Sequence, residues 1–123
     1  QSEVTGAISR AACNLADAIS AAAIVTTTAS GSTARLIARL RPTAPVLGVT
    51  TSVNVARHLA LSWGVIPAVV NKTGDLAALG DALLQEITSR QLAQAGDHVI
   101  VTAGLPLGFS DSTNVLQIYQ LKE

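Results

Sequence analysis

Short apolar segments rich in β-branched residues alternate along this chain with longer segments whose apolar residues recur every three to four positions. The short segments, each suited to one buried strand, are 22–27, 45–50, 65–70 and 98–103. The helical periodicity appears at 4–19, 34–40, 53–63 and 76–87. Because neighbouring parallel strands need a crossover of helix length, this alternation predicts an α/β domain with a largely parallel sheet.

The segment 115–121 is the last candidate strand, and it partly alternates apolar with polar residues as an edge strand does. The loop before it has only about ten residues, which is shorter than a parallel crossover requires. We therefore expect this strand to be antiparallel. The predicted fold is a three-layer αβα domain with a mostly parallel five-stranded sheet, and no linker divides residues 1–123.

Particular residues are expected to define the helices. In the first helix the predicted apolar face consists of Val4, Ile8, Ala11, Leu15, Ala16 and Ile19. The third helix is expected to include Trp63 and to end at Gly64, and the fourth to end just before Gly96. Its inner stripe is predicted to be Leu76, Leu79, Leu83 and Ile87.

The composition limits the class of protein. Hydrophobic residues make up 49% of the 123 residues and charged residues 13%, with a mean hydropathy of +0.44. Such a chain has apolar surface to bury within itself or against a partner, so we expect a homo-oligomer. A formal net charge of zero and an aromatic content of 2% argue against a nucleic-acid-binding surface.

The location of the protein is expected to be cytoplasmic. No apolar run reaches the roughly 20 residues of a membrane span, and the first residues do not read as a signal peptide. Cys13 is the only cysteine, which excludes an internal disulfide. The chain starts at Gln1 and contains no methionine, so we expect it to be part of a longer polypeptide.

The turn after the first strand carries the strongest local signal. It spans Thr27 to Ala34. A turn between strand and helix can offer backbone N–H groups and hydroxyls at the positive end of a helix dipole, which suits a phosphate. The alternative, of equal weight from spacing alone, is that Ser30 or Ser32 only caps the helix.

A second hydroxyl-rich loop, 104–114, follows the fourth strand. If the first strand is central and the fourth lies beside it, both loops leave the carboxyl ends of the strands that flank the topological switch point. Open α/β sheets bind ligands there. The alternative is an ordinary turn before an edge strand, with Phe109 as a packing residue.

No catalytic or metal-binding arrangement can be identified. His58 is expected on a helix surface, His98 at the start of a strand, and Cys13 in the core or an interface. The carboxylates are scattered rather than paired. Arg35 and Arg39 lie four apart on one helix and could brace a ligand, although a solvated face or a subunit contact is the expected use.

Five groups of residues, taken in order, resemble the C-terminal domain of pyruvate kinases over nearly the whole chain. They are 22–25; 30–37 with 41–42 and 44–45; 56–57 with 59–61 and 63–65; 96–97 with 99–106 and Gly108; and 112–114. The resemblance implies five strands with the last antiparallel, an allosteric effector site and a tetramer interface. It also implies that a catalytic barrel, which uses divalent and potassium ions, should precede Gln1, while this domain holds no cofactor.

The resemblance assigns the site residues. The family's phosphate-binding loop maps onto Thr28, Ala29, Ser30, Gly31, Ser32 and Thr33. Its effector loop maps onto Gly104, Leu105, Pro106, Gly108, Phe109, Ser110, Ser112 and Thr113. Family members that bind a sugar bisphosphate use extra basic or aromatic groups for the second phosphate.

Here the effector loop carries Leu105, Leu107 and Asp111, and 74–84 contains no Lys or Arg. This favours a sugar monophosphate or nucleoside monophosphate, with Lys72 as a charge partner.

The leading expectation is therefore the regulatory domain of a pyruvate kinase, which binds a phosphorylated effector and contributes to subunit assembly. One alternative is a structural module that mediates subunit contact and binds no ligand. Another is a stand-alone small protein that binds or acts on a phosphorylated metabolite. The absence of a candidate acid–base pair makes an enzyme the least favoured of the three.

Overall fold

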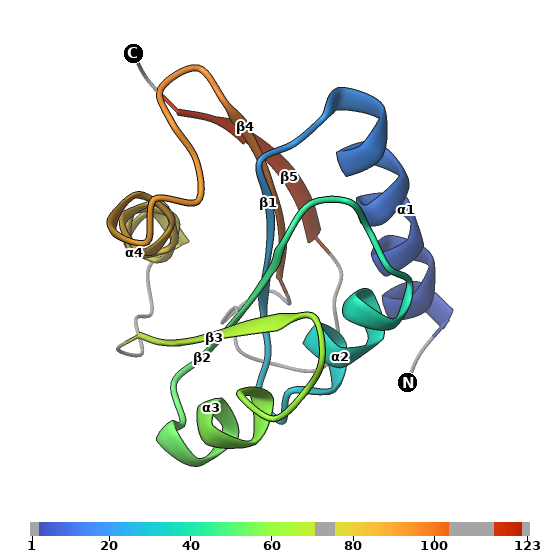
Figure 1. Cartoon of the computed structure of the whole chain (residues 1–123), viewed down its shortest axis with the longest axis vertical. Helices are drawn as coiled ribbons and strands as arrows, with labels where there is room; N and C mark the ends of the chain where they lie inside the picture. The colour runs from blue at the N-terminus through green and yellow to red at the C-terminus, as the bar shows by residue number, and fades with distance from the viewer. Residues whose placement is uncertain (1–2, 71–75, 104–114, 122–123) are drawn as a thin grey trace.

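The computed structural model describes residues 3–70, 76–103 and 115–121, and it contains a five-stranded sheet. Its elements in chain order are α1 (Glu3–Ile19), β1 (Ala23–Thr27), α2 (Ser32–Arg39), β2 (Val46–Thr50), α3 (Val53–Leu59), β3 (Val65–Val69), α4 (Leu76–Ser89), β4 (His98–Ala103) and β5 (Val115–Gln120). Figure 1 shows the strands between α4 on one side and α1 and α2 on the other.

The strand order is β3-β2-β1-β4-β5, which makes β1 the central strand. β1 pairs in parallel with both β2 and β4, so that Ile24 lies between Val46 and Ile100. β4 and β5 are antiparallel, with Val99 opposite Tyr119. The predicted fold is confirmed, including the direction of the last strand. β5 is more exposed to solvent than the neighbouring strands, as expected of an edge strand.

The sheet separates two apolar layers. On one face Val25, Leu47 and Val99 pack with Leu83 and Ile87 of α4, which confirms these two members of its predicted stripe. On the other face a core of small residues from α1 meets β1, β4 and α2, with Ile24, Ile37 and Ile100 fully buried. A third cluster joins α2, α3 and β3. The side chains of Leu76 and Leu79 lie outside the described residues.

The predicted apolar face of α1 was correct at Ala16 and wrong at Val4 and Ala11. Val4 is 55% exposed and Ala11 is exposed, whereas the buried line is Thr5, Ser9, Ala12, Cys13 and Ala16. Small side chains let α1 approach the sheet closely, and the buried Ser9 hydroxyl donates to the Thr5 carbonyl at 2.8 Å. Leu15 and Ile19 pack at the margin of this contact.

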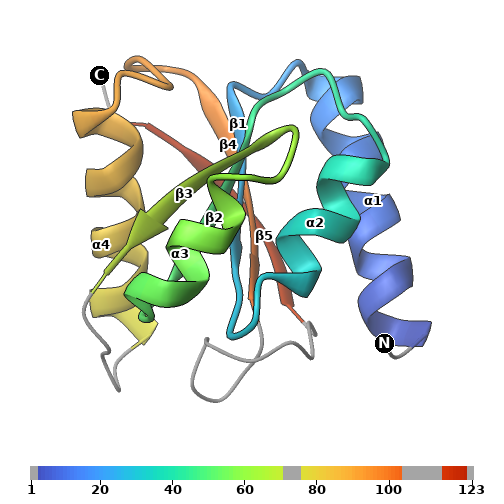
Figure 2. The same cartoon turned by 60° about the horizontal axis from the view of Figure 1, so that its bottom comes forward.

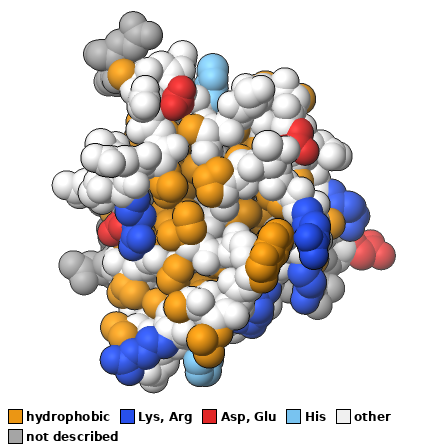
Figure 3. All heavy atoms as spheres, in the orientation of Figure 1, with side chains coloured by type: hydrophobic (Ala, Val, Ile, Leu, Met, Phe, Trp, Pro, Cys, Tyr) orange, Lys and Arg blue, Asp and Glu red, His pale blue; other side chains and the backbone are white. Residues whose placement is uncertain are grey.

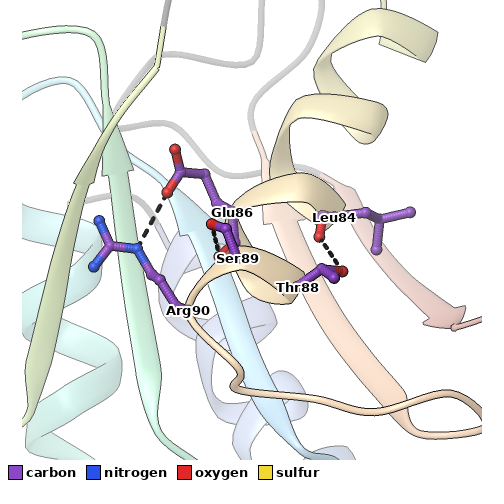
Figure 4. A network of polar contacts seen from close by, with 5 residues as sticks. All are labelled: Leu84, Glu86, Thr88, Ser89 and Arg90. Atoms are coloured by element: carbon purple, nitrogen blue, oxygen red, sulfur yellow. Dashed lines mark hydrogen bonds and ion pairs between the residues drawn. The ribbon is translucent and has the colours of Figure 1, made fainter.

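The end of α4 also differs from the prediction. The helix stops at Ser89, because Gln91 adopts a left-handed conformation (φ 58) and Leu92 N–H donates to the Ile87 carbonyl at 3.1 Å. This is a Schellman motif with glutamine in the position that glycine usually takes. Figure 4 shows the last turn: Thr88 and Ser89 donate to backbone carbonyls, and Arg90 pairs with Glu86 at 3.1 Å. Gly96 follows only after a further turn.

The third helix is shorter than predicted. α3 ends at Leu59, and Trp63 lies in the turn before β3, where it is 71% exposed. The Ser52 hydroxyl caps the start of α3 by accepting from Val55 N–H at 3.2 Å. Gly64 has φ 81 and is the last residue of the turn before β3. Among the described residues, no helix has both the length and the apolar character needed to cross a bilayer.

Candidate functional site

The topological switch point lies between β1 and β4. The chain leaves the carboxyl end of β1 for α2 and β2 on one side, while β4 pairs with the opposite edge of β1. The carboxyl ends of these two parallel strands lie side by side, while the strands that follow them, β2 and β5, lie on opposite sides, as ligand crevices in open α/β sheets require. Figure 2 brings this end of the sheet forward, where β1 passes into the first turn of α2. The predicted adjacency of the first and fourth strands is confirmed.

The turn from Thr28 to Gly31 is held by backbone bonds and one hydroxyl. Thr28 N–H donates to the Val49 carbonyl at 2.9 Å, which prolongs the pairing of β1 with β2. The Thr28 hydroxyl then accepts from Gly31 N–H at 2.8 Å. Gly31 is the N-cap of α2 and has no side chain, but the Ser30 hydroxyl accepts from Ser32 N–H in the first turn at 3.4 Å. Ser30 thus bonds to the first turn of α2, as the capping alternative allowed, and the positive end of the helix dipole points into the turn.

Gly31 cannot be replaced without moving its neighbours. Its φ of 93 lies in the left-handed region. A Cβ atom there would lie 2.8 Å from Nη1 of Arg35 and 2.9 Å from Cδ2 of Leu59. Leu59 is fully buried against Ala34 and Ala38 of α2, so it has little room to move. The glycine thus allows the turn to lie close to α3.

Arg35 places a positive charge against this turn. Its side chain is half-buried, and Nη2 lies 3.5 Å from the Ser30 carbonyl oxygen. The sequence favoured a solvated face or a subunit contact for this residue. The sequence signal for a contact between Arg35 and the turn was its position four residues after Gly31, because a side chain in the first turn of a helix can fold back toward the N-terminus. A guanidinium there suits an anionic ligand.

Three buried hydroxyls lie at the same end of the sheet. Thr26 and Thr102 are register partners on the face that α1 and α2 cover, and Thr27 lies on the opposite face. All three are fully buried, and their hydroxyls have no hydrogen-bond partner among the residues described. A buried hydroxyl left unsatisfied costs about 1–3 kcal/mol. The switch point therefore contains hydrogen-bonding capacity that the described part of the chain does not use.

Part of the predicted site lies outside the described residues. This applies to the whole effector loop, from Gly104 to Thr113, and to Lys72. The described residues thus include the whole predicted phosphate-binding turn, 28–33.

Other candidate chemical groups are dispersed. No group of three or more His, Cys, Asp or Glu residues in the described ranges is placed to hold a metal ion. His58 is exposed on α3, as predicted. Cys13 is buried in the core, also as predicted, and its thiol lies 3.9 Å from the Ile37 carbonyl. Burial, with a smaller effect of Asp17, raises the pKa of Cys13 to about 11, so the thiol is a poor nucleophile at neutral pH.

Known proteins match this chain along almost its full length. The family model described as pyruvate kinase, alpha/beta domain, matches residues 6–119. The pyruvate kinase of Clostridium acetobutylicum is 42% identical over 111 residues, which is 90% of this chain and 24% of that protein. The pyruvate kinase of Geobacillus stearothermophilus is 34% identical over 123 residues, which is 100% of this chain and 21% of that protein.

A solved structure agrees with these matches. The crystal structure of a pyruvate kinase from Cryptosporidium parvum superposes with a TM-score of 0.85 and 28% identity, covering 98% of this chain and 23% of that one. The chain therefore spans 21–24% of the length of these similar proteins. Family model, sequence identity and fold agree, and the chain belongs to the pyruvate kinase family, within which it corresponds to the C-terminal α/β domain.

Proposed function

We propose that this chain is the regulatory domain of a pyruvate kinase and that it binds a phosphorylated effector at the turn 28–33. The observation that carries the proposal is the N-terminus of α2, which directly follows the central strand at the switch point. Backbone N–H groups and the helix dipole at such a terminus favour a phosphate without any dedicated basic residue.

The side chains around the turn fit the same ligand. The guanidinium of Arg35 lies beside the Ser30 carbonyl, where it can reach an anion held by the turn. The hydroxyls of Ser30 and Ser32 are on residues that are not fully buried. Charge-assisted hydrogen bonds of this kind are shorter and stronger than neutral ones, so a phosphate would gain more here than an uncharged sugar.

We further propose that the effector carries a single phosphate, as in a sugar monophosphate or a nucleoside monophosphate. The support is the sequence of the two segments that would meet a second phosphate. The loop 104–114 contains Asp111 and no Lys or Arg, and 74–84 is equally free of basic residues. A second phosphate would therefore meet no compensating charge from these segments.

Catalysis is assigned to another part of the polypeptide. The similar proteins are four to five times as long as this chain, which leaves room for the barrel that transfers phosphate between phosphoenolpyruvate and ADP in glycolysis. Mg²⁺ and K⁺ are expected to bind to that barrel. Within this proposal the domain also takes part in homo-oligomer assembly in the cytoplasm, through which effector binding could reach the catalytic site.

Calorimetric titration of the chain with glucose 6-phosphate, AMP, fructose 1,6-bisphosphate and inorganic phosphate tests the proposal. We expect saturable binding of at least one monophosphate, and no tighter binding of the bisphosphate. Ser30→Ala, Thr33→Val and Arg35→Gln should each weaken binding by about 1.5–3 kcal/mol, the range for hydrogen bonds to charged groups. Arg57→Gln removes an exposed charge on α3 and serves as the control.

The result also separates the proposal from its main alternative. A chain that binds none of these ligands but forms a stable dimer would be a structural module. Binding that Ser30→Ala and Arg35→Gln leave unchanged would place the ligand elsewhere, and the assignment of the turn 28–33 would be wrong.

A further inference from the structure

A second surface, which meets the proposed effector site only at Arg35, lies between α2 and the turn that leads into β3. Two adjoining hollows of about 450 and 390 Å³ share Ala38, Arg41 and Trp63. The first extends along α2 to Arg35 and Arg39, and the second continues past Pro42 and Pro45 toward Ile66. We call this surface the α2–β3 groove. It runs on to the amino ends of β2 and β3, whereas the switch point is at the carboxyl ends of the strands.

Trp63 forms an exposed aromatic platform in this groove. It is the only tryptophan of the chain and is 71% exposed. The guanidinium carbon of Arg41 lies 4.6 Å from the centre of its ring, which is a cation–π contact. Arg41 has φ 54 at the end of α2, and its N–H donates to the Ala38 carbonyl at 3.0 Å. The helix end thus fixes the residue that holds the ring, so that the aromatic face is prearranged.

The charge of the groove is of one sign. Arg35, Arg39 and Arg41 line it, and no Asp or Glu does. The ion pair found within the described ranges, Arg90 with Glu86, is on α4 at the other side of the sheet. Figure 3 shows Arg side chains gathered over α2 beside apolar side chains at the start of β3. Because the whole chain has zero net charge, this positive surface is local.

Guanidinium groups beside an exposed aromatic ring recognise carboxylates together with an apolar side chain. Arg35 and Arg39 are four residues apart, so their Cβ atoms are about 6 Å apart along one helix face. Arg41 follows beyond them, and the second hollow continues past Trp63. An extended ligand with several separated negative charges matches this spacing better than one compact anion.

We propose that the α2–β3 groove binds an acidic polypeptide segment of a partner protein, with carboxylates on Arg39 and Arg41 and an apolar side chain on Trp63. Charge complementarity selects this partner. A nucleic acid is the weaker fit, because a zero net charge and an aromatic content of 2% provide neither a broad phosphate-binding surface nor successive stacking platforms.

Fluorescence of the single tryptophan reports directly on this groove. The probe is an eight-residue peptide with glutamate at six positions and leucine at the two central ones. We expect a saturable change in Trp63 emission, affinity that falls as salt is raised, and at least tenfold weaker binding of the same peptide with glutamine for glutamate. The lysine version should not bind.

Variants locate the binding. Arg39→Gln and Arg41→Gln should each weaken the glutamate peptide about two- to fivefold, as expected for partly exposed ion pairs, while Arg57→Gln on α3 should leave it unchanged. Trp63→Leu, measured by calorimetry, should weaken it roughly tenfold. Circular dichroism of each variant checks that the fold is retained.

Four results would overturn the proposal. The first is the absence of saturable binding at millimolar peptide, and the second is equal binding of the glutamine peptide. The third is displacement of the glutamate peptide by inorganic phosphate at low millimolar concentration and constant ionic strength. The fourth is self-association of the chain that Trp63→Leu abolishes. The third would place the peptide at the turn 28–33, and the fourth would make a second copy of this chain the occupant. Ligand binding at the turn is measured separately with Ser30→Ala, so either site can fail without the other.

Discussion

Gly48, in the middle of β2, controls how closely α2 and α3 approach the sheet. A Cβ atom at this position would lie 3.0 Å from Cβ of Ala34, 3.1 Å from Cγ1 of Val65 and 3.2 Å from Cδ1 of Leu59. All three neighbours are buried in the cluster that joins α2, α3 and β3. Gly48→Ala must therefore push at least one of these elements outward, and α2 carries the proposed effector turn.

The expected loss of stability follows from these contacts. Overpacking a well-packed core costs about 1–3 kcal/mol. Alanine also restricts the unfolded chain, which restores about 0.4–1 kcal/mol. We therefore expect a net loss of about 1–2 kcal/mol, or a fall in Tm of roughly 4–12 °C for a domain near 100 residues.

Urea unfolding followed by far-UV circular dichroism measures this loss, with an unchanged m-value showing that the unfolded state is unaffected. Gly80→Ala is the matched control on α4. Its Cβ would meet nothing closer than the Tyr119 hydroxyl at 3.4 Å, which is ordinary contact. Glycine inside a helix lowers protein stability relative to alanine, so the free energy of unfolding of Gly80→Ala should rise by about 0.5–1 kcal/mol.

A double-mutant cycle with Ala34→Gly tests the cause. Removing the Ala34 methyl group opens the closest contact, so the two substitutions together should cost less than the sum of their separate effects. A free energy of unfolding for Gly48→Ala within 0.5 kcal/mol of the wild type would contradict overpacking at Gly48. So would stability losses of Gly48→Ala and Ala34→Gly that simply add in the double variant.

Three further predictions concern the thiol, catalysis and assembly. Burial raises the pKa of Cys13 from 9.0 to about 11, so between these pH values the unfolded state loses a proton that the folded state keeps, and stability should fall by up to about 1.4 kcal/mol per pH unit. Urea unfolding of wild type and Cys13→Ala from pH 8 to 11.5 should show the fall only in the wild type, and parallel curves would contradict it. The chain alone should transfer no phosphate from phosphoenolpyruvate to ADP with Mg²⁺ and K⁺ present, and turnover above background would refute this. Sedimentation equilibrium should show at least a dimer, formed through the edge strand β5 or the region 52–63, and Ile118→Lys on the exposed edge should weaken a β5-mediated dimer. A wild-type monomer at every concentration would disprove assembly by this domain alone.

The predicted phosphate-binding turn illustrates how far local sequence reaches. The residues Thr28 to Thr33 were identified because a hydroxyl-rich turn joined a buried strand to a helix, and the structure places this turn at the switch point. Their role in binding remains a prediction. Arg35 was considered as a brace for a ligand, but a solvated face or a subunit contact was favoured, since its contact with the Ser30 carbonyl depends on how the side chain folds back over the first turn.

The groove at Trp63 was not predicted at all. The periodicity placed Trp63 on a helix, but α3 ends four residues earlier and leaves the ring exposed. Arg41 and Trp63 are far apart in sequence, and only the packing of α2 against α3 brings the guanidinium over the ring. No local pattern encodes such a contact.

The sequence by itself determined the order and type of the elements, because hydrophobic periodicity and β-branched runs act over a few neighbouring residues. It also predicted the direction of β5, because a short loop cannot make a parallel crossover. The tertiary structure alone decided that Ser9, Ala12 and Cys13 belong to the buried face of α1, since close packing favoured these small residues over larger apolar ones. It likewise decided where α4 ends, because Gln91 takes a left-handed conformation while Leu92 remains packed against the core. Both outcomes depend on contacts between segments distant in the chain, which local propensity does not contain.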